Sequence, residues 1–131
     1  MNRPTGAQCV DSFDAVKAVG RTLPGVEATT RYDGAPVLKV GGCFMAMLST
    51  HASAESGTLI VRSGFEERAC LIEDAPNTYY VTEYHRKHPV VLVRLSRLHP
   101  DALRDLLTMS WRLTLAKTGA RRRARRDGAG R

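Results

Sequence analysis

The sequence predicts an α+β domain in which helices pack on one face of a mostly antiparallel sheet of five to six strands. Helical spacing of apolar residues occurs near the start, in the middle and towards the end of the chain, and short strand-like runs lie between these segments. Short turns join the runs, which favours antiparallel pairing because a parallel crossover needs a dozen or more residues. The predicted order is one helix, three or four strands, a helix, two strands and a long helix.

The length and composition predict a single domain. The chain has 131 residues, of which 43% are hydrophobic and 25% charged, as in ordinary globular proteins. We expect a flexible N-terminus over residues 1–10, a folded domain over 11–117 and a disordered arginine-rich tail over 118–131. No apolar run approaches the roughly 20 residues that span a membrane, and no secretory signal is evident, so we expect no membrane insertion.

The first helix is expected to begin at Asp11 or Ser12, because both residue types cap helices. Pro24 and Gly25 end it, and a short strand over residues 27–31 follows. Its apolar positions recur at three- and four-residue steps: Phe13, Val16, Val19 and Leu23.

A β-hairpin is the clearest local signal. Two strand-like runs flank Gly41-Gly42, and two-residue hairpin turns favour glycine because they need positive φ. The expected strands are 36–40 and 43–48. This register places Val40 opposite Cys43 and Leu38 opposite Met45, which gives one continuous apolar face.

The remaining elements follow from the same patterns. The second helix is expected to bury Phe65, Ala69 and Ile72 on one side, and the long helix begins at Pro100 and ends near Lys117. The expected ranges are strands at 58–62, 78–83 and 90–95, a helix at 65–74 and a polar loop at 84–89. The strand at 90–95 is the most apolar and is expected to be central in the sheet.

Four segments, taken in order, resemble the MmcQ/YjbR family. They read LPGVE at 23–27, YDGAPVLKVGG at 32–42, HPVVLVRL at 88–95 and LTMSWRL at 107–113, and the likeness covers about residues 12–117. The resemblance implies a frataxin-like α+β fold, also described as a double-wing DNA-binding motif, and with it a role in DNA binding. Two features depart from the family pattern. Cys43 follows the hairpin glycines where such proteins often have lysine, and the arginine-rich tail is additional.

The positive charge is concentrated at the C-terminal end. The formal net charge is +7, of which residues 117–131 carry +6 and residues 1–116 only +1. Each arginine of the tail can meet a phosphate and release counterions, while nothing in the tail reads base edges. We therefore expect largely sequence-independent binding of a nucleic acid, with DNA favoured, or of another polyanion. The tail residues expected to bind are Arg121, Arg122, Arg123, Arg125 and Arg126.

The polar loop offers a second set of contacts. Arg86, Lys87 and His88 are expected to reach phosphates from a wing-like loop, and Tyr84 is available for stacking. His85 and His88 lack a third ligand nearby, so we expect no metal site.

The sequence carries no pattern of catalytic residues. It lacks a phosphate-binding glycine loop and the other spacings that tie a nucleophile to a base, so we expect no enzyme and no cofactor. Three widely spaced cysteines, Cys9, Cys43 and Cys70, form no disulfide framework and suit the reducing cytoplasm.

The expected function is therefore that of a non-enzymatic, nucleic-acid-associated protein. The alternative is a binding module for a protein or small ligand that uses the open face of the sheet. A contiguous exposed apolar patch of Phe44, Leu48 and Tyr80 would favour this alternative.

Overall fold

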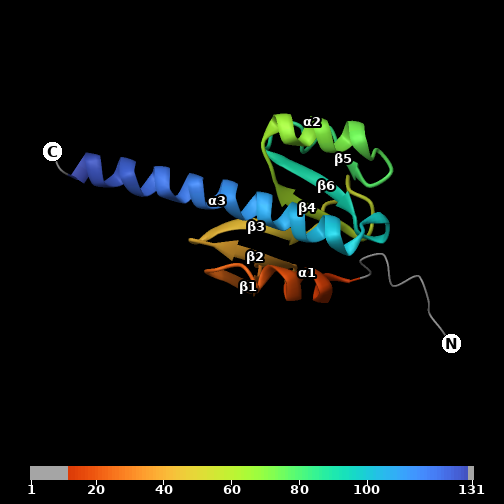
Figure 1. Cartoon of the computed structure of the whole chain (residues 1–131), viewed down its shortest axis with the longest axis horizontal. Helices are drawn as coiled ribbons and strands as arrows, with labels where there is room; N and C mark the ends of the chain where they lie inside the picture. The colour runs from red at the N-terminus through yellow and green to blue at the C-terminus, as the bar shows by residue number, and fades with distance from the viewer. Residues whose placement is uncertain (1–11, 130–131) are drawn as a thin grey trace.

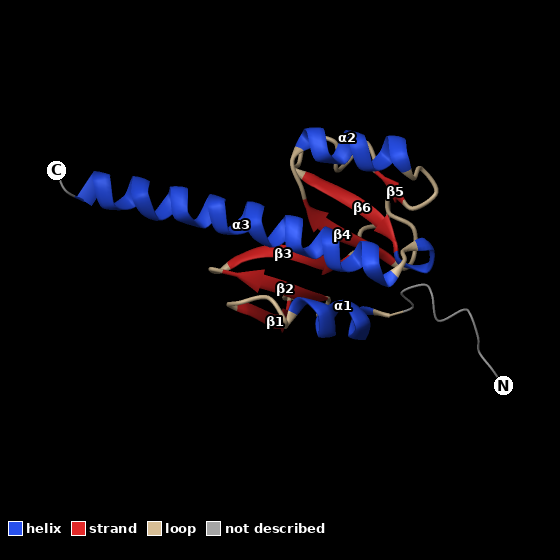
Figure 2. Cartoon of the chain, in the orientation of Figure 1, coloured by secondary structure: helices blue, strands red, loops and turns tan. Residues whose placement is uncertain are grey.

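A six-stranded antiparallel sheet and three helices form the fold, which confirms the predicted class (Figures 1 and 2). The computed structural model describes residues 12–129, and for 120–129 it describes the backbone alone. The sheet order is β1-β2-β3-β4-β6-β5. The elements are α1 (Phe13–Gly20), β1 (Val26–Thr30), β2 (Pro36–Val40), β3 (Cys43–Leu48), β4 (Thr58–Arg62), α2 (Phe65–Asp74), β5 (Tyr79–Tyr80), β6 (Val90–Arg94), a 3₁₀ turn (Leu95–Arg97) and α3 (Pro100–Ala129). The flexible N-terminus predicted over residues 1–10 lies outside the described residues.

The sheet separates two apolar clusters because successive side chains of a strand point to opposite faces. On the helix side, Leu59, Val61, Val91 and Val93 pack with residues of all three helices. On the other side, Ile60, Val90 and Leu92 form a smaller cluster with half-buried neighbours from β3, β5 and the loop before β4. The predicted central strand, β6, lies between β4 and β5 and is buried on both faces.

The predicted hairpin forms, with Val40 opposite Cys43 and positive φ at both turn glycines. The predicted pairing of Leu38 with Met45 is wrong, because Leu38 lies opposite Ala46. A bulge between Leu38 and Lys39 leaves Met45 without a partner on β2. Leu38 and Met45 still share the helix-side core, so the apolar pattern was correct and the register was not.

Two predicted elements on the β5 side differ from the structure. In α2, Phe65 is 51% exposed and Ala69 is exposed, while Leu71 and Ile72 pack against the core. The helix covers β5 and β6 at the margin of the sheet, so the predicted buried side is wrong for Phe65 and Ala69 and right for Ile72. The strand predicted over 78–83 is confined to β5 because a turn follows it, held by the backbone bond from His85 to the Thr82 carbonyl.

The third helix is longer than predicted. Its backbone continues past Lys117 and Gly119 to Ala129, whereas the sequence predicted that the helix ends near Lys117. Alanine and arginine are strong helix formers, and one internal glycine costs only about 1 kcal/mol, so nothing in the chain forces a stop. Thr118 is buried over the hairpin and contacts Cys43, which holds α3 against the sheet at this point.

Candidate nucleic-acid interface

Several loops and the departing third helix meet at one end of the sheet. The strand register aligns Val26 with Val40 and Arg62 with Val90, so β1 and β6 begin where β2 and β4 end. Thr118 lies over Gly41 at this same end, because a Cβ added to Gly41 would come within 2.8 Å of its Cγ2. From here α3 projects beyond the sheet (Figure 1). We call this region the helix-exit end.

Four cations at the helix-exit end form no ion pair within the described part of the chain. Arg21 lies in the turn before β1, Lys39 lies two residues before Gly41 of the hairpin turn, and Lys87 and Lys117 are both exposed. None of these four forms a salt bridge with residues 12–119. Lys39 lies opposite Glu27 in the β1–β2 pair, so an anion approaching this end meets chiefly the exposed cations Arg21, Lys87 and Lys117.

The opposite end of the sheet is different. Arg31 pairs with Asp33 at 3.7 Å, and Arg94 pairs with Glu55 at 2.8 Å. Arg104, at the start of α3, lies 3.7 Å from Asp101. Three arginines are thus paired at this end, while Arg97 is exposed and forms no salt bridge with a described residue. The sequence alone did not indicate Arg21 and Lys39, since neither belongs to a charge cluster along the chain.

The predicted polar loop is fixed to the helix-exit end by one arginine. Arg68 of α2 donates hydrogen bonds to the carbonyl oxygens of Arg86, His88 and Val90 at 3.1, 3.0 and 3.2 Å. Burial lowers the pKa of Arg68 from its ordinary value, and the positive charge of Arg86 lowers it further. Three carbonyls on one guanidinium hold the loop backbone in place, so its exposed side chains extend from a supported base.

The three predicted contact residues of this loop are not equivalent. The Arg86 guanidinium lies 3.2 Å from the Glu83 carboxylate, which offsets its charge. Lys87 and His88 are exposed. Tyr84 is also exposed, but its ring stacks on His51 with centroids 3.8 Å apart, so one face is already occupied. His51 comes from the loop over residues 49–57 and was not predicted here.

A hydrogen-bonded chain of side chains joins the two loops. The His51 Nδ1 atom accepts from the Ser53 N–H at 3.0 Å, and the Ser53 hydroxyl lies 3.4 Å from that of Thr82. The Thr82 hydroxyl lies 2.6 Å from Nδ1 of His85, which is buried. Burial lowers the pKa of His85, and positive charge on His51 and His88 lowers it further. This chain supports the loop, and no group of three potential ligands among the described residues could hold a metal ion.

The predicted tail positions lie on the projecting part of α3. The backbone at Arg121, Arg122, Arg123, Arg125 and Arg126 is helical. A helix rises about 1.5 Å per residue, so the segment from Gly119 to Ala129 extends about 15 Å past the last contact with the hairpin. The structure thus brings the tail and the 84–88 loop to the same end of the sheet.

The open face does not form the patch that the alternative function requires. The guanidinium of Arg62 lies 4.5 Å from the ring centre of Phe44, and that of Arg94 lies 4.2 Å from the ring of Tyr80. Leu48 packs with the helix-side core instead. Two aromatic rings, each paired with a cation, therefore replace the expected contiguous apolar surface.

Comparison with known proteins identifies one family. A family model described as YjbR matches residues 21–113, which is well over half of the chain. The search of curated proteins and the search of solved structures each found no match. Between residues 12 and 129, no helix combines the length and apolar character that crossing a membrane requires.

Proposed function

The chain belongs to the YjbR family, and on that basis we propose that it is a non-enzymatic cytoplasmic protein that binds nucleic acid, with DNA as the first candidate. The observation that supports this most is the continuity of α3. One helix runs from the core to five arginine positions and leaves the body where unpaired cations gather. The proposed contacts are with phosphates and depend little on base sequence.

Helical geometry gives the arginine segment a suitable shape. A helix with its side chains is about 10–12 Å across, close to the roughly 12 Å width of the DNA major groove. Each arginine that meets a phosphate releases counterions, so affinity falls steeply with salt. The arginine segment supplies most of the affinity in this proposal.

The polar loop adds a smaller contribution. Lys87 and His88 extend from the backbone that Arg68 holds, on the same end of the sheet as the departing helix. Arg86 contributes less, because Glu83 already offsets its charge. A duplex along α3 would thus also meet the loop and the turn that contains Arg21.

The test is a salt titration of duplex binding by fluorescence anisotropy. The full chain is compared with a chain that ends at Gly119, which keeps the buried Thr118 contact that a stop at Lys117 would remove. Loss of five arginine contacts is expected to reduce the slope of log K against log salt by about 0.9 per contact and to weaken binding at low salt.

A full-length variant with all five arginines changed to glutamine is the matched control, because it preserves chain length and helix propensity. It is expected to bind as weakly as the shortened chain. Equal affinity of the full chain, the shortened chain and the glutamine variant would exclude the proposal. Equal binding to heparin and to DNA would change the partner to polyanions in general.

A further inference from the structure

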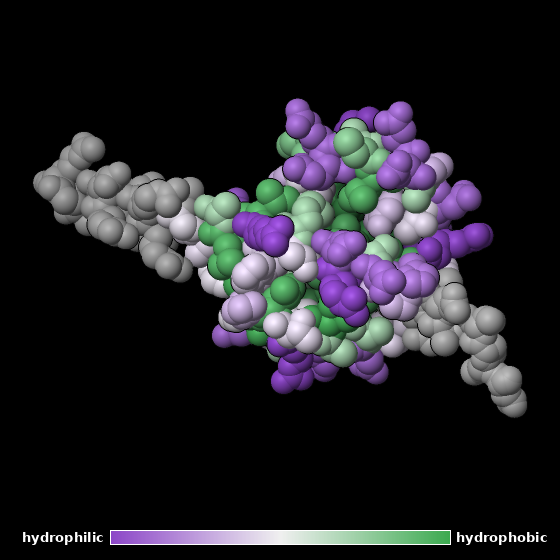
Figure 3. Space-filling model, in the orientation of Figure 1, coloured by the Kyte–Doolittle hydropathy of each residue, from purple (hydrophilic) through white to green (hydrophobic). Residues whose placement is uncertain are grey.

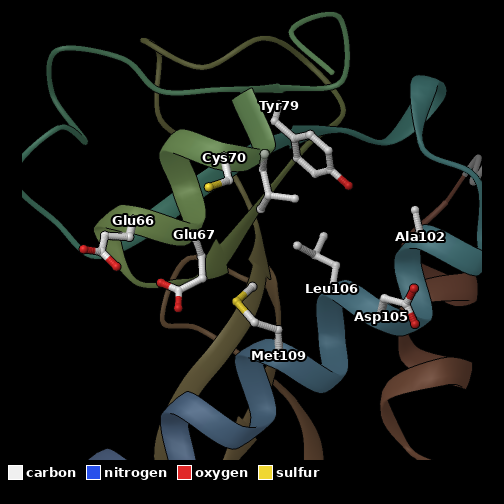
Figure 4. Close-up of a pocket in the computed structure, with 9 residues that line it drawn as sticks. Glu66, Glu67, Cys70, Tyr79, Ala102, Asp105, Leu106 and Met109 are labelled. Atoms are coloured by element: carbon white, nitrogen blue, oxygen red, sulfur yellow. The ribbon is translucent and has the colours of Figure 1, made fainter. Parts of the chain in front are cut away.

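A cavity lies between α2 and α3. Its volume is about 490 Å³, within the range of small-molecule sites. Leu71, Leu106 and Met109 form its apolar lining, and Figure 4 shows the two helices facing each other across it. Apolar surface is also visible between these helices in the space-filling view (Figure 3).

A buried hydroxyl points into this cavity. Tyr79 on β5 is only 6% exposed, and its ring extends towards α3 with the hydroxyl at the cavity (Figure 4). No residue in the described part of the chain gives this hydroxyl a hydrogen bond. Burial raises its pKa, and the negative charge of Asp105 raises it further. Buried tyrosine hydroxyls usually have a partner, so this one is available to a ligand.

Three carboxylate residues line the same cavity, at separate places along it (Figure 4). Glu66 and Glu67 come from α2, and Asp105 comes from α3. None of them forms a salt bridge with a described residue. Arg104 and Arg112 line an adjoining groove that shares Asp105 and Met109 with the cavity. The cavity therefore combines an apolar lining with carboxylates that form no salt bridge among the described residues.

We propose that this cavity binds a small apolar molecule that carries one protonated amine. The apolar part packs against Leu71, Leu106 and Met109, and the removal of this apolar surface from water favours binding. The ammonium group donates hydrogen bonds to the Asp105 carboxylate and to the Tyr79 hydroxyl oxygen, and Glu66 and Glu67 add attraction. The site is distinct from the proposed nucleic-acid interface, because its lining is apolar and acidic and includes none of the proposed phosphate-contact residues.

Two probes of nearly the same shape test the charge requirement. Tryptamine carries an ammonium group, and indole-3-propionate carries a carboxylate in its place. Titration of the ¹⁵N-labelled full chain is expected to give saturable amide shifts with tryptamine, confined to residues 66–71, 79–80 and 102–109. Indole-3-propionate is expected to bind at least about tenfold more weakly, the equivalent of one charge-assisted hydrogen bond.

Two substitutions test the named groups. Asp105→Asn and Tyr79→Phe are each expected to weaken tryptamine binding by about five- to tenfold. Asp101→Asn is the matched control, because Asp101 is an exposed carboxylate on the same helix that does not line the cavity. Equal binding of the two probes, shifts outside the cavity, absence of saturation, or equal effects of Asp101→Asn and Asp105→Asn would each overturn the proposal.

Discussion

The buried hydroxyl group of Ser110 compensates for an irregularity in the sheet. The bulge in the β2–β3 pair leaves Met45 without a partner on β2, and Ser110 of α3 donates a hydrogen bond to the Met45 carbonyl at 2.7 Å. Ser110 is fully buried. A polar residue is therefore required at a position where helical periodicity alone would favour an apolar one.

Replacement of this serine is expected to be costly. Ser110→Ala leaves a buried carbonyl without its donor and should lower the free energy of unfolding by about 1–3 kcal/mol, measured by urea denaturation. Thr108→Ala is the control, because Thr108 is half-buried and bonds only to its own helix, at Arg104. A change for Ser110→Ala no larger than that of the control would show that the carbonyl has another partner.

The buried histidine makes stability depend on pH. Burial lowers the pKa of His85 below its ordinary value of 6.5, so the unfolded chain takes up a proton at a higher pH than the folded one. The stabilisation is complete above pH 6.5 and is lost as the pH falls through the lower folded pKa. His85→Gln should make the free energy of unfolding less dependent on pH between 7 and 5, whereas His88→Gln keeps the burial of His85, the main cause of the lowered pKa, and should retain most of the dependence.

At this scale the sequence identified individual residues better than their partners. Arg86, Lys87 and His88 were assigned to an exposed loop, and all three are exposed. The stack of Tyr84 on His51 joins residues from separate loops, and no local spacing encodes it. Likewise Arg68, which supports the loop, resembles an ordinary surface arginine of an amphipathic helix until its three carbonyl partners are known.

The contact between α3 and the hairpin turn fixes how these two elements meet. Gly41 and Gly42 both have positive φ, at 62° and 81°. A Cβ at Gly41 would meet the Thr118 side chain at 2.8 Å, whereas one at Gly42 would meet nothing within 4 Å. Gly42 is therefore required only by the positive φ of the turn, whereas Gly41 is required both by its positive φ and by the close contact with Thr118.

This difference gives an expected order of stability. Gly42→Ala should cost about 1–2 kcal/mol through backbone strain alone. Gly41→Ala should cost about 1–3 kcal/mol more, because it also displaces the helix. Adding Thr118→Ser, which removes the closest methyl group, should recover part of the excess in Gly41→Ala and none in Gly42→Ala. Equal costs for the two alanine variants in thermal unfolding would contradict the packing contact.

The elements that depend on signals from neighbouring residues were predicted better than those that depend on the whole fold. The glycine turn located the hairpin and a short run of apolar residues located β4, because both signals act within a few residues. The end of α3 was wrong because Gly119 is only a weak helix breaker when good helix formers follow it. The buried side of α2 was wrong at Phe65 and Ala69, because the position of this helix at the sheet margin depends on the whole fold.

At the scale of the whole molecule, the decisive property is where charge lies. The body is nearly neutral overall. Arg21, Lys87 and Lys117 at the helix-exit end form no ion pair with described residues, whereas Arg31, Arg94 and Arg104 at the other end each pair with a carboxylate. The family and the sheet with its helices on one face could be predicted, since four ordered segments and the element order carry them. The segregation of charge could not, because it depends on strand register.

Two exposed cations at opposite ends test this segregation. Lys87 lies at the helix-exit end and Arg97 lies in the 3₁₀ turn that follows β6 at the other end. Lys87→Gln should weaken duplex binding and lower the salt slope by about 0.9, whereas Arg97→Gln should change neither. A similar loss in both variants would indicate that net charge matters and its location does not.

The continuity of α3 also determines how the domain and a bound duplex would move relative to each other. Thr118 is wedged over Gly41, and the same helix continues to Ala129 with no interruption between the two parts. The helix has no break or hinge between the core and the arginine positions. A duplex held by that segment would therefore tumble together with the domain as one rigid particle, at an angle to the sheet set by the hairpin.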